Sequence, residues 1–449
     1  MTRILYVYAR GGAPLEHAFP RIAALGELHV LALTPLPTAA AEQWRDSCAS
    51  VTVLPETPHG DALVQAVVAH ADTFGADAVL TLSEFAVLAV ARAADKLGLR
   101  GAGPNVVLAR DKRLMREAWA AAGVPVPGFR RVDGRADLRA AVADLHLPVL
   151  LKPAWGAGSI GQAVLRSDAD VDPVWSAIDA ALDRGGEIGM TELYEPGADR
   201  TLLVEEIVRG STEGWYDRPG YADYVSVEGI VADGVHHALG VTARLPPIPP
   251  FNEVGSTAPC VVPVDLQRRV EDVARRAVDA LGLRTCGTHT ELKLCADGRI
   301  VVIETAARFG GVLITREIEE VFGLDPIELL VRELLGHRVD YPPAMLVDGC
   351  RAAASLVLTP ADAAGNPWRS RPIWAPDAVD WAAMLSPGST IEPVRSAATP
   401  PGRPVPAFDP AGGAANWLGV YLITAVDPDT LLRDCNAVLD GLESALPTD

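Results

Sequence analysis

The sequence predicts a protein of mixed α/β class with several domains, on three observations. Its 449 residues exceed the usual size of one domain and suggest about three domains. Short apolar segments alternate with helix-forming segments over residues 1–105, which is typical of an open α/β domain. Further along, several strand-like apolar segments follow one another and favour a mostly antiparallel sheet, so the later regions are predicted to be α+β.

The N-terminal elements are predicted from apolar runs and turn residues. Residues 4–8 are a short apolar strand that ends before a turn at Gly11-Gly12. This glycine pair is not part of a G-x-G-x-x-G sequence, so it is weak evidence for dinucleotide binding. The other elements expected in this domain are helices at 15–25 and 86–97 and strands at 28–33 and 78–82.

A second unit is expected after the first domain. Residues 111–122 contain good helix formers and end at Gly123 before two prolines, which indicates a helix and a domain boundary. The proline-rich residues 245–250 and 399–410 are expected to be loops, because proline does not fit central strands. Further strands are expected at 149–152, 164–165, 202–208, 224–231, 238–242, 353–358 and 420–424, and a last amphipathic helix at 429–446.

Composition limits the classes of function. The formal net charge is -19, from 58 acidic and 39 basic residues, which argues against binding to nucleic acid or to anionic membranes. No apolar stretch approaches the ~20 residues that a membrane helix needs, and the N-terminal apolar run is typical of a strand rather than of a signal peptide. The six cysteines are scattered, so we expect reduced thiols in a cytoplasmic protein.

Two glutamates, Glu291 and Glu304, occupy equivalent positions in two successive apolar runs. Ala296-Asp297-Gly298 lies between the runs and is typical of a hairpin turn, so strand pairing would aim both carboxylates at one point, with Arg308 just after the second. Two carboxylates on rigid strands beside a guanidinium suit Mg2+ that carries nucleotide phosphates. The alternative is an amphipathic hairpin with two surface acids.

A lysine followed by a glycine-rich turn is a second motif. Lys152 ends an apolar strand, and Gly156, Gly158, Ser159 and Gly161 follow it. Because glycine has no Cβ, the backbone N–H groups of such a loop come close to phosphate oxygens. The lysine precedes the glycines, so this is not a Walker A loop. The alternative is a glycine-rich hairpin beside a surface lysine.

Five further residues suit a nucleotide, each weakly on its own. Lys112 stands at the start of a predicted helix and is a second candidate for phosphate, although a lysine there is usually only solvated. Glu205 and Glu206 end an apolar strand before Val208, where a backbone edge could bond an adenine base between aliphatic side chains. Glu213, a few residues later, could then reach the ribose hydroxyls.

The order of these motifs resembles the ATP-grasp superfamily across roughly residues 105–340. Within that superfamily, residues 215–234 (WYDRPGYADYVSVEGIVADG) and 303–330 (IETAARFGGVLITREIEEVFGLDPIELL) are similar to L-amino-acid ligases of the bacilysin-synthetase type. Most ATP-grasp ligases have asparagine two residues after the second metal glutamate. Ala306 stands in that place, as in the bacilysin-type subgroup. The resemblance therefore implies that Glu291 and Glu304 coordinate the metal.

The resemblance implies an ATP-grasp fold with a Rossmann-like pre-ATP-grasp domain at the N-terminus and an α+β region at the C-terminus. The expected domains are residues 1–105 for the N-terminal domain, 106–200 for the small lid and linker, 201–345 for the nucleotide- and metal-binding region, and 346–449 for the C-terminal region. Dimers are common among such ligases, so a homodimer is also compatible with the resemblance.

The resemblance also implies a reaction. In this family ATP phosphorylates the carboxylate of one amino acid, and the amine of a second amino acid attacks the acyl phosphate to give a dipeptide, ADP and phosphate. Lys112, Lys152 and Mg2+, or Mn2+ in its place, would neutralise charge on the phosphates. Arg308 would hold the transferred phosphoryl group and the oxyanion of the tetrahedral intermediate. The glycine-rich loop would close over ATP and keep water out.

Several residues match the amino-acid site of the family. Glu84 in TLSEF and Glu253 in PFNEVGS would bind the ammonium group of the first amino acid, although an acid after a strand is also a common helix cap. Val312, directly after Gly311, would set the length of the pocket for that amino acid. Ser256 replaces the histidine expected in the bacilysin type, which leaves the acceptor side open.

Two other functions stay open. An ATP-grasp carboxylase would activate bicarbonate and would have no use for glutamates at an ammonium site; ATP turnover stimulated by bicarbonate would favour it. A non-catalytic nucleotide-binding module would bind ATP without releasing ADP, but such a protein usually loses one of the charged residues, and here Lys152, Glu291, Glu304 and Arg308 are all present.

Overall fold

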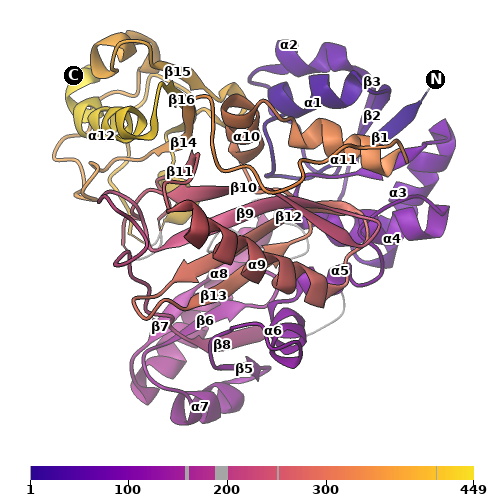
Figure 1. The fold of residues 1–449 in the computed structure, drawn as a ribbon, viewed down its shortest axis with the longest axis horizontal. Coiled ribbons are helices and arrows are strands. Elements are labelled where there is room, and N and C mark those ends of the chain that lie inside the picture. Colours follow the sequence, from indigo (N-terminus) through magenta and orange to yellow (C-terminus); the bar gives the residue numbers. More distant parts are fainter. Residues whose placement is uncertain (1, 157–160, 188–200, 250–251, 411, 449) are drawn as a thin grey trace.

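The computed structural model describes residues 2–156, 161–187, 201–249, 252–410 and 412–448. The strands form three sheets (Figure 1): a four-stranded sheet of order β3-β2-β1-β4, a second of order β5-β8-β6-β7, and an eight-stranded sheet of order β13-β12-β9-β10-β11-β14-β16-β15. The eight-stranded sheet occupies the middle of the molecule, with the first sheet beside it and the second below it in the view of Figure 1.

The N-terminal residues fold into a parallel α/β unit, as expected. Strand β1 is buried along its length after Arg3 and pairs with β2 on one side and β4 on the other. Parallel strands that are buried on both faces are continuous apolar runs, so the sequence located them well. The elements are β1 (Arg3–Tyr8), α1 (Leu15–Ala23), β2 (Glu27–Ala32), α2 (Ala41–Trp44), η1 (Arg45–Ser47), β3 (Cys48–Val53), α3 (Asp61–Phe74), β4 (Ala78–Leu80), η2 (Glu84–Ala86) and α4 (Val87–Leu97).

The second sheet is antiparallel, and helices α7 and α8 pack against it. Asp111 caps helix α6, because its side chain accepts a hydrogen bond from the Arg113 N–H. Apolar side chains of helices α7 and α8 share one hydrophobic cluster with β5, β6 and β8. The elements are α5 (Val106–Arg110), α6 (Lys112–Ala121), β5 (Phe129–Val132), α7 (Arg135–Asp144), β6 (Val149–Pro153), β7 (Ala163–Leu165), η3 (Asp168–Asp170), α8 (Val171–Glu187) and β8 (Leu202–Glu206).

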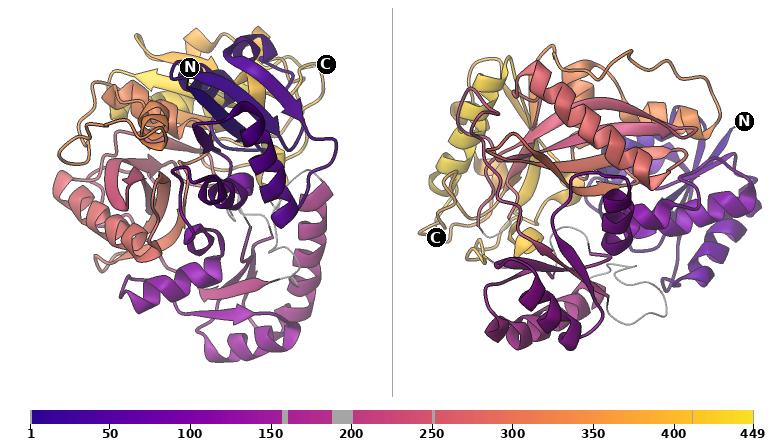
Figure 2. Two further views of the ribbon diagram at one scale, coloured as in Figure 1. Left: turned by 90° about the vertical axis from the view of Figure 1, so that its right-hand side faces the viewer. Right: turned by 60° about the horizontal axis from the view of Figure 1, so that its bottom comes forward.

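The eight-stranded sheet is antiparallel between all the neighbours that pair along it. Helix α9 runs across one face of this sheet (Figure 2). The elements are β9 (Tyr224–Ala232), β10 (Val235–Arg244), β11 (Gly255–Ala258), α9 (Val264–Leu281), β12 (Cys286–Leu294), β13 (Ile300–Ala306), α10 (Ile314–Phe322), α11 (Pro326–Leu334), β14 (Ala352–Leu358), η4 (Pro376–Ala378), η5 (Trp381–Met384), β15 (Thr390–Pro393), η6 (Arg395–Ala397), η7 (Gly413–Asn416), β16 (Gly419–Ala425) and α12 (Pro428–Ala445).

One expectation about the sheets is wrong. The strand segments between residues 149 and 242 were expected to share one mostly antiparallel sheet, whereas β6, β7 and β8 form a sheet with β5, and β9 and β10 belong to the eight-stranded sheet. Strand β9 instead has β12 as its second neighbour, from residues about 60 positions later. The alternation of apolar and polar residues along a strand indicates its two faces but not the strands it pairs with. The sequence pattern therefore could not reveal that these strands belong to two sheets.

The strands of the C-terminal region extend the same eight-stranded sheet across the boundary expected near residue 345. Strand β14 pairs with β11, and β16 pairs with β14. The four expected domains otherwise stay predictions.

Two expectations from composition can be compared with the structure. All six cysteines are free thiols, as expected. Within the described ranges, none of the helices combines the length and the apolar character needed to cross a membrane.

Candidate active site

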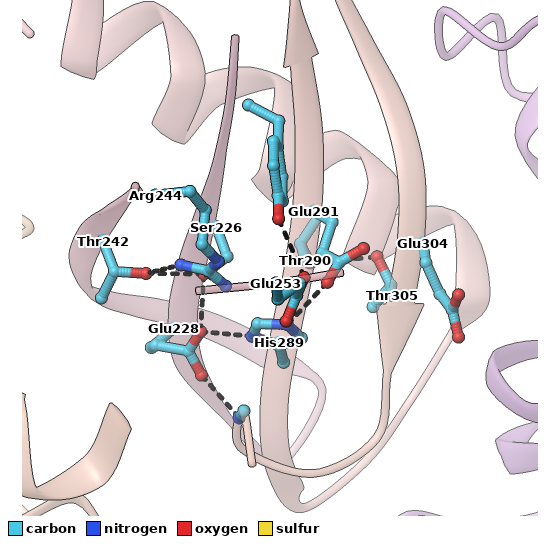
Figure 3. Close-up of polar contacts among 12 residues, drawn as sticks. Ser226, Glu228, Thr242, Arg244, Glu253, His289, Thr290, Glu291, Glu304 and Thr305 are labelled. Atoms are coloured by element: carbon cyan, nitrogen blue, oxygen red, sulfur yellow. Dashed lines mark hydrogen bonds and ion pairs between the residues drawn. The ribbon is translucent and has the colours of Figure 1, made fainter. Parts of the chain in front are cut away.

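One face of the eight-stranded sheet is polar where four neighbouring strands meet. Residues directly opposite each other in antiparallel strands share a face, and so do residues two apart on one strand. The register therefore groups seven residues, which we call the polar row (Figure 3): Glu304 of β13, Glu291 and His289 of β12, Ser226 and Glu228 of β9, and Thr242 and Arg244 of β10. The opposite face is apolar, with Val225 and Val227 packed in one cluster with Val270 of α9.

The paired glutamates lie as the sequence predicted. Strands β12 and β13 form the expected hairpin, and Glu291 is directly opposite Glu304. Their side chains keep 24% and 26% of their surface exposed, so both carboxylates remain accessible. Lys112 Nζ lies 2.8 Å from Glu304 Oε1 and also donates to the Gly156 carbonyl at 2.6 Å. A lysine of α6 therefore anchors the second glutamate from across the site.

The first glutamate is held by a histidine for which no role was predicted. His289 Nε2 lies 3.3 Å from Glu291 Oε1, and Nδ1 of the same ring bonds Glu228. Burial would lower the pKa of His289, but the two carboxylates raise it to about 9. Burial would likewise raise the pKa of Glu291, but the bond and charge of His289, with Arg244 and Arg308, lower it to about 2. Glu291 is therefore an anion at neutral pH.

This donor set fits Mg2+ that is shared with a nucleotide. Mg2+ prefers oxygen ligands and is usually bound by one or two carboxylates together with substrate phosphates. Glu291 and Glu304 supply those carboxylates, and within the described parts of the chain no group of three or more histidine, cysteine or acidic side chains forms a closed metal site. Phosphate and water oxygens would complete the coordination.

Lys152 and Glu205, predicted to contact phosphate and adenine, lie together in a buried ion pair. Lys152 on β6 pairs with the Glu205 carboxylate on β8, and Arg116 Nε donates to the same carboxylate at 3.0 Å. Burial lowers the pKa of Lys152, although Glu205 opposes that shift. Arg116 also donates to the Ile303 carbonyl at 2.5 Å, just before Glu304. Through Arg116, Glu205 therefore ties the sheet of β5, β6, β7 and β8 to the hairpin of the paired glutamates.

Glu205→Ala is expected to lower the free energy of unfolding by about 3–5 kcal/mol, because it leaves two buried cations, Lys152 and Arg116, without their shared carboxylate. Urea denaturation followed by circular dichroism measures this loss. Glu206→Ala is the matched control, since that neighbouring side chain is one-third exposed and pairs with the exposed His146. Equal, small losses for the two variants would contradict the prediction.

The remaining nucleotide candidates are spread along the end of β8 and the loop after it. Glu206 Oε1 accepts hydrogen bonds from the His146 backbone and ring. Val208 is half-buried, and Glu213 is exposed. Gly158 and Ser159, predicted to cradle phosphate, lie outside the described residues. The structure therefore places Glu206 beside Glu205 without testing the nucleotide contacts of any of these residues.

Glu84 and Arg308 meet although 224 positions separate them in the chain. Arg308 Nε lies 2.8 Å from Glu84 Oε2, and Arg110 Nε lies 3.7 Å from Glu84 Oε1. Burial would raise the pKa of Glu84, but Arg308, Arg110 and Lys112 lower it. The predicted ammonium-binding carboxylate therefore faces two guanidinium groups, and its binding of a substrate stays a prediction.

The segment Gly311-Val312 is fixed by the N-terminal domain. Val312 has a φ of +58°, and its N–H donates to the Gly12 carbonyl at 3.1 Å. A left-handed conformation in a β-branched residue costs on the order of 1–3 kcal/mol and occurs mostly at functional sites. Gly12 itself has a φ of +84°, and a Cβ there would clash with the Leu82 carbonyl. The Gly11-Gly12 turn thus serves close packing beside Val312.

Glu253 and Ser256 lie on the β10–β11 side of the polar row. Glu253 is exposed, and its Oε1 accepts a hydrogen bond from Tyr224 Oη at 2.9 Å. Ser256 is opposite Arg244 and donates to Glu317 of α10. Arg244 is buried and donates to Thr242 Oγ1 at 2.6 Å and Ser226 Oγ at 2.9 Å. The structure therefore adds Arg244 and Glu317 to this end of the site.

Glu317→Gln is expected to gain stability relative to the wild type as the pH rises. Glu317 is completely buried, its Oε2 has no hydrogen-bond partner among the described residues, and burial raises its pKa from 4.5 to about 7. Because the pKa of Glu317 is raised in the folded state, its protonated carboxyl stabilises the wild type fully below pH 4.5. About 3 kcal/mol of this stability is lost as the pH rises through 7. Urea denaturation of both proteins between pH 5 and 8 measures the change; a constant difference would contradict it.

Some of the site residues that the sequence analysis did not predict could have been found from the sequence, and others could not. Arg116 is four residues after Lys112 on α6, and this spacing places both side chains on one helix face toward the site. Glu228 is the single charged residue of the largely apolar strand β9, which is a recognisable signal for a buried polar site, whereas Arg244 is the last residue of β10. His289 had no signal beyond its position two residues before Glu291.

A family model and several known proteins are similar to this chain. A family model described as an ATP-grasp domain matches residues 145–316. Alanine–anticapsin ligase of Bacillus subtilis (strain 168) is 34% identical over 288 residues, which cover 64% of this chain and 60% of the length of that curated relative. An L-amino acid ligase structure from Bacillus licheniformis has a TM-score of 0.71 at 19% identity, covering 99% of this chain and 98% of that one. A biotin carboxylase structure from Campylobacter jejuni has a TM-score of 0.65 at 15% identity, covering 95% and 88%.

The matched domain contains both paired glutamates and strand β6, which carries Lys152. The two structural likenesses extend over nearly the whole chain, and at their low identity they concern the fold. Residues 145–316 therefore match an ATP-grasp domain, and the chain has the ATP-grasp fold.

Proposed function

We propose that the protein is an ATP-dependent ligase that joins two amino acids through an aminoacyl phosphate, giving a dipeptide, ADP and phosphate. The observation that carries the proposal is the direct pairing of Glu291 with Glu304, which Lys112 contacts from α6. The 34% identity to a ligase named for alanine and anticapsin supports amino acids as the substrates. The ATP-grasp domain supports ATP as the source of the activating phosphoryl group.

The reaction would proceed in two steps. A carboxylate oxygen of the first amino acid bonds the γ-phosphorus of ATP, and the bond from that phosphorus to the bridging oxygen breaks to release ADP. The amine nitrogen of the second amino acid then bonds the acyl carbon, loses a proton, and expels phosphate. The first step brings negative oxygens together and the second develops an oxyanion at the acyl carbon, so the site must supply positive charge and exclude water.

The described residues suit those tasks. Mg2+ held by Glu291 and Glu304 would supply positive charge to the phosphates of ATP. Lys112 orients Glu304, and Lys152 lies on β6, which precedes the glycine-rich segment in the sequence. Arg308 follows β13 directly, where its guanidinium could bond the transferred phosphoryl group and then the oxyanion.

A phosphate-release screen tests the proposal. Purified protein with MgATP is assayed against all pairs of amino acids, and mass spectrometry identifies the products. The expected result is phosphate release that requires an amino-acid pair, with equal amounts of ADP and dipeptide. Phosphate release with bicarbonate but with no amino acid would replace the proposal by an ATP-grasp carboxylase. ATP binding without turnover under every mixture would indicate a non-catalytic nucleotide-binding module.

The partners proposed are small-molecule amino acids, without nucleic acid or membrane. The net charge of -19 supports this choice, because phosphate backbones and anionic lipids repel an acidic protein. We further propose a cytoplasmic location, supported by the six free thiols, and a homodimer. Size-exclusion chromatography with light scattering measures the oligomeric state.

A further inference from the structure

Glu228 is a fully buried carboxylate in the middle of the polar row, and its side chain has no exposed surface. It belongs to β9, which lies between β10 and β12, so strands cover it on both sides. A group in this position does not touch a substrate directly. Any effect that Glu228 has on the site therefore passes through the residues bonded to it.

Three groups donate hydrogen bonds to the two oxygens of Glu228 (Figure 3). His289 Nδ1 and Ser226 Oγ, the latter at 3.1 Å, bond Oε1. The Gly310 backbone N–H bonds Oε2 at 2.9 Å. Burying a carboxylate is costly unless it is paired and hydrogen-bonded, and these donors offset that cost. The donors come from three different segments, so this one side chain joins them.

The first link leads to the paired glutamates. His289 donates a hydrogen bond from Nδ1 to Glu228, and its Nε2 lies 3.3 Å from Glu291 Oε1. A histidine ring that a carboxylate holds on one nitrogen is fixed in orientation. Glu228 therefore sets the direction from which His289 contacts Glu291.

The second link leads to the segment of Arg308 and Val312. Gly310 lies between these residues, and its amide is the donor to Glu228. A Cβ at Gly310 would clash with the Ile314 side chain and with the His289 ring, so the backbone packs directly against that histidine. Loss of the Glu228 bond would free this backbone at the point where it enters the predicted amino-acid pocket.

We propose that Glu228 is a positioning residue that fixes two parts of the site at once: Glu291 through His289, and the Arg308–Val312 segment through the Gly310 amide. Its contribution to catalysis rests on the proposed function, whereas its effect on metal binding and on the Gly310 backbone does not. The proposal predicts that one isosteric change disturbs metal affinity and the amino-acid pocket together.

Glu228→Gln in the full chain tests this. Binding of Mn2+ with ADP, followed by electron paramagnetic resonance, is expected to weaken about tenfold, and kcat for dipeptide formation to fall about 10- to 100-fold. The KM for the amino acids is expected to rise as well. In the metal-free protein, hydrogen exchange of peptides that contain Gly310 is expected to accelerate. Unchanged Mn2+ affinity together with unchanged exchange would overturn the proposal.

Glu333→Gln is the matched control, because Glu333 of α11 is also a buried carboxylate and accepts a hydrogen bond from Tyr341. It is expected to leave Mn2+ affinity and Gly310 exchange unchanged. Equal effects in both variants would assign the result of Glu228→Gln to general loss of packing and overturn the proposal.

If Glu228→Gln does not fold, His289→Gln is the variant that tests the proposal. It is expected to weaken Mn2+ binding about tenfold, and unchanged binding would overturn the link to Glu291.

The two proposals fail in different ways. A wild-type protein that binds Mn2+ with ADP but forms no dipeptide from any pair would contradict the proposed function. The effect of Glu228→Gln on Mn2+ affinity and on Gly310 exchange would still decide the positioning role, because neither measurement needs turnover.

Discussion

Glu304→Gln is expected to lower ATP-dependent phosphate release about a thousandfold, which corresponds to about 4 kcal/mol of transition-state stabilisation. Glu304 lies opposite Glu291, and these two carboxylates are the proposed metal ligands. Glutamine keeps the size of the side chain but removes its charge, and it leaves Lys112, 2.8 Å away, without its acidic partner. Phosphate release is measured with MgATP and the amino acids identified in the screen.

A control on the same sheet separates this loss from unfolding. Glu392 lies exposed on the edge strand β15, so Glu392→Gln is expected to turn over normally. Circular dichroism and thermal unfolding should show both variants folded. Normal turnover by Glu304→Gln would remove the metal assignment and, with it, the observation on which the proposed ligase activity depends.

Arg308→Met is expected to lower dipeptide synthesis about 100- to 1,000-fold while binding of MgADP stays within a few fold of the wild type. Loss of one donor to a developing oxyanion typically has an effect of this size on kcat. The Arg308 side chain is 16% exposed and is held by Glu84 at 2.8 Å, so its guanidinium is oriented before substrate arrives. Single-turnover product formation and MgADP titration measure the two quantities.

The conservative variant makes this test specific. Arg308→Lys keeps a charge near Glu84 but cannot offer the paired donors of a guanidinium, so an intermediate loss of rate is expected. In both variants Glu84 retains Arg110, 3.7 Å away, as a counter-charge. A fall in MgADP affinity as large as the fall in kcat would assign Arg308 to ground-state nucleotide binding instead.

The sequence predicted local structure well wherever one short segment carried the whole signal. The apolar run of β1 and the helix that Asp111 begins both form where expected. The turn at Ala296-Asp297-Gly298 begins the hairpin with Leu294 opposite Ile300, and a shift in register between Glu291 and Leu292 then places Glu291 opposite Glu304. The proposed metal ligands were therefore found from about twenty consecutive residues.

Contacts between distant segments were not predictable in the same way. Glu84 meets Arg308 because the N-terminal sheet packs on α11, whose Ile327 and Leu330 share a hydrophobic cluster with Ile4. Arg244, Glu228 and His289 come from three strands whose neighbours are fixed only in the assembled sheet. A sequence pattern gives the faces of each strand, and tertiary packing selects the strand beside it.

The amino-acid sequence by itself predicted helices α1, α4, α6 and α12, most of the strands, the hairpin with its two carboxylates, and the resemblance to the ATP-grasp superfamily. Only the tertiary structure decided which charges are paired: Lys152 with Glu205, Arg308 with Glu84, and Glu228 with His289. The physical reason is that the energy of a buried charge depends on the partners within a few ångströms of it, and folding brings these partners from remote parts of the chain.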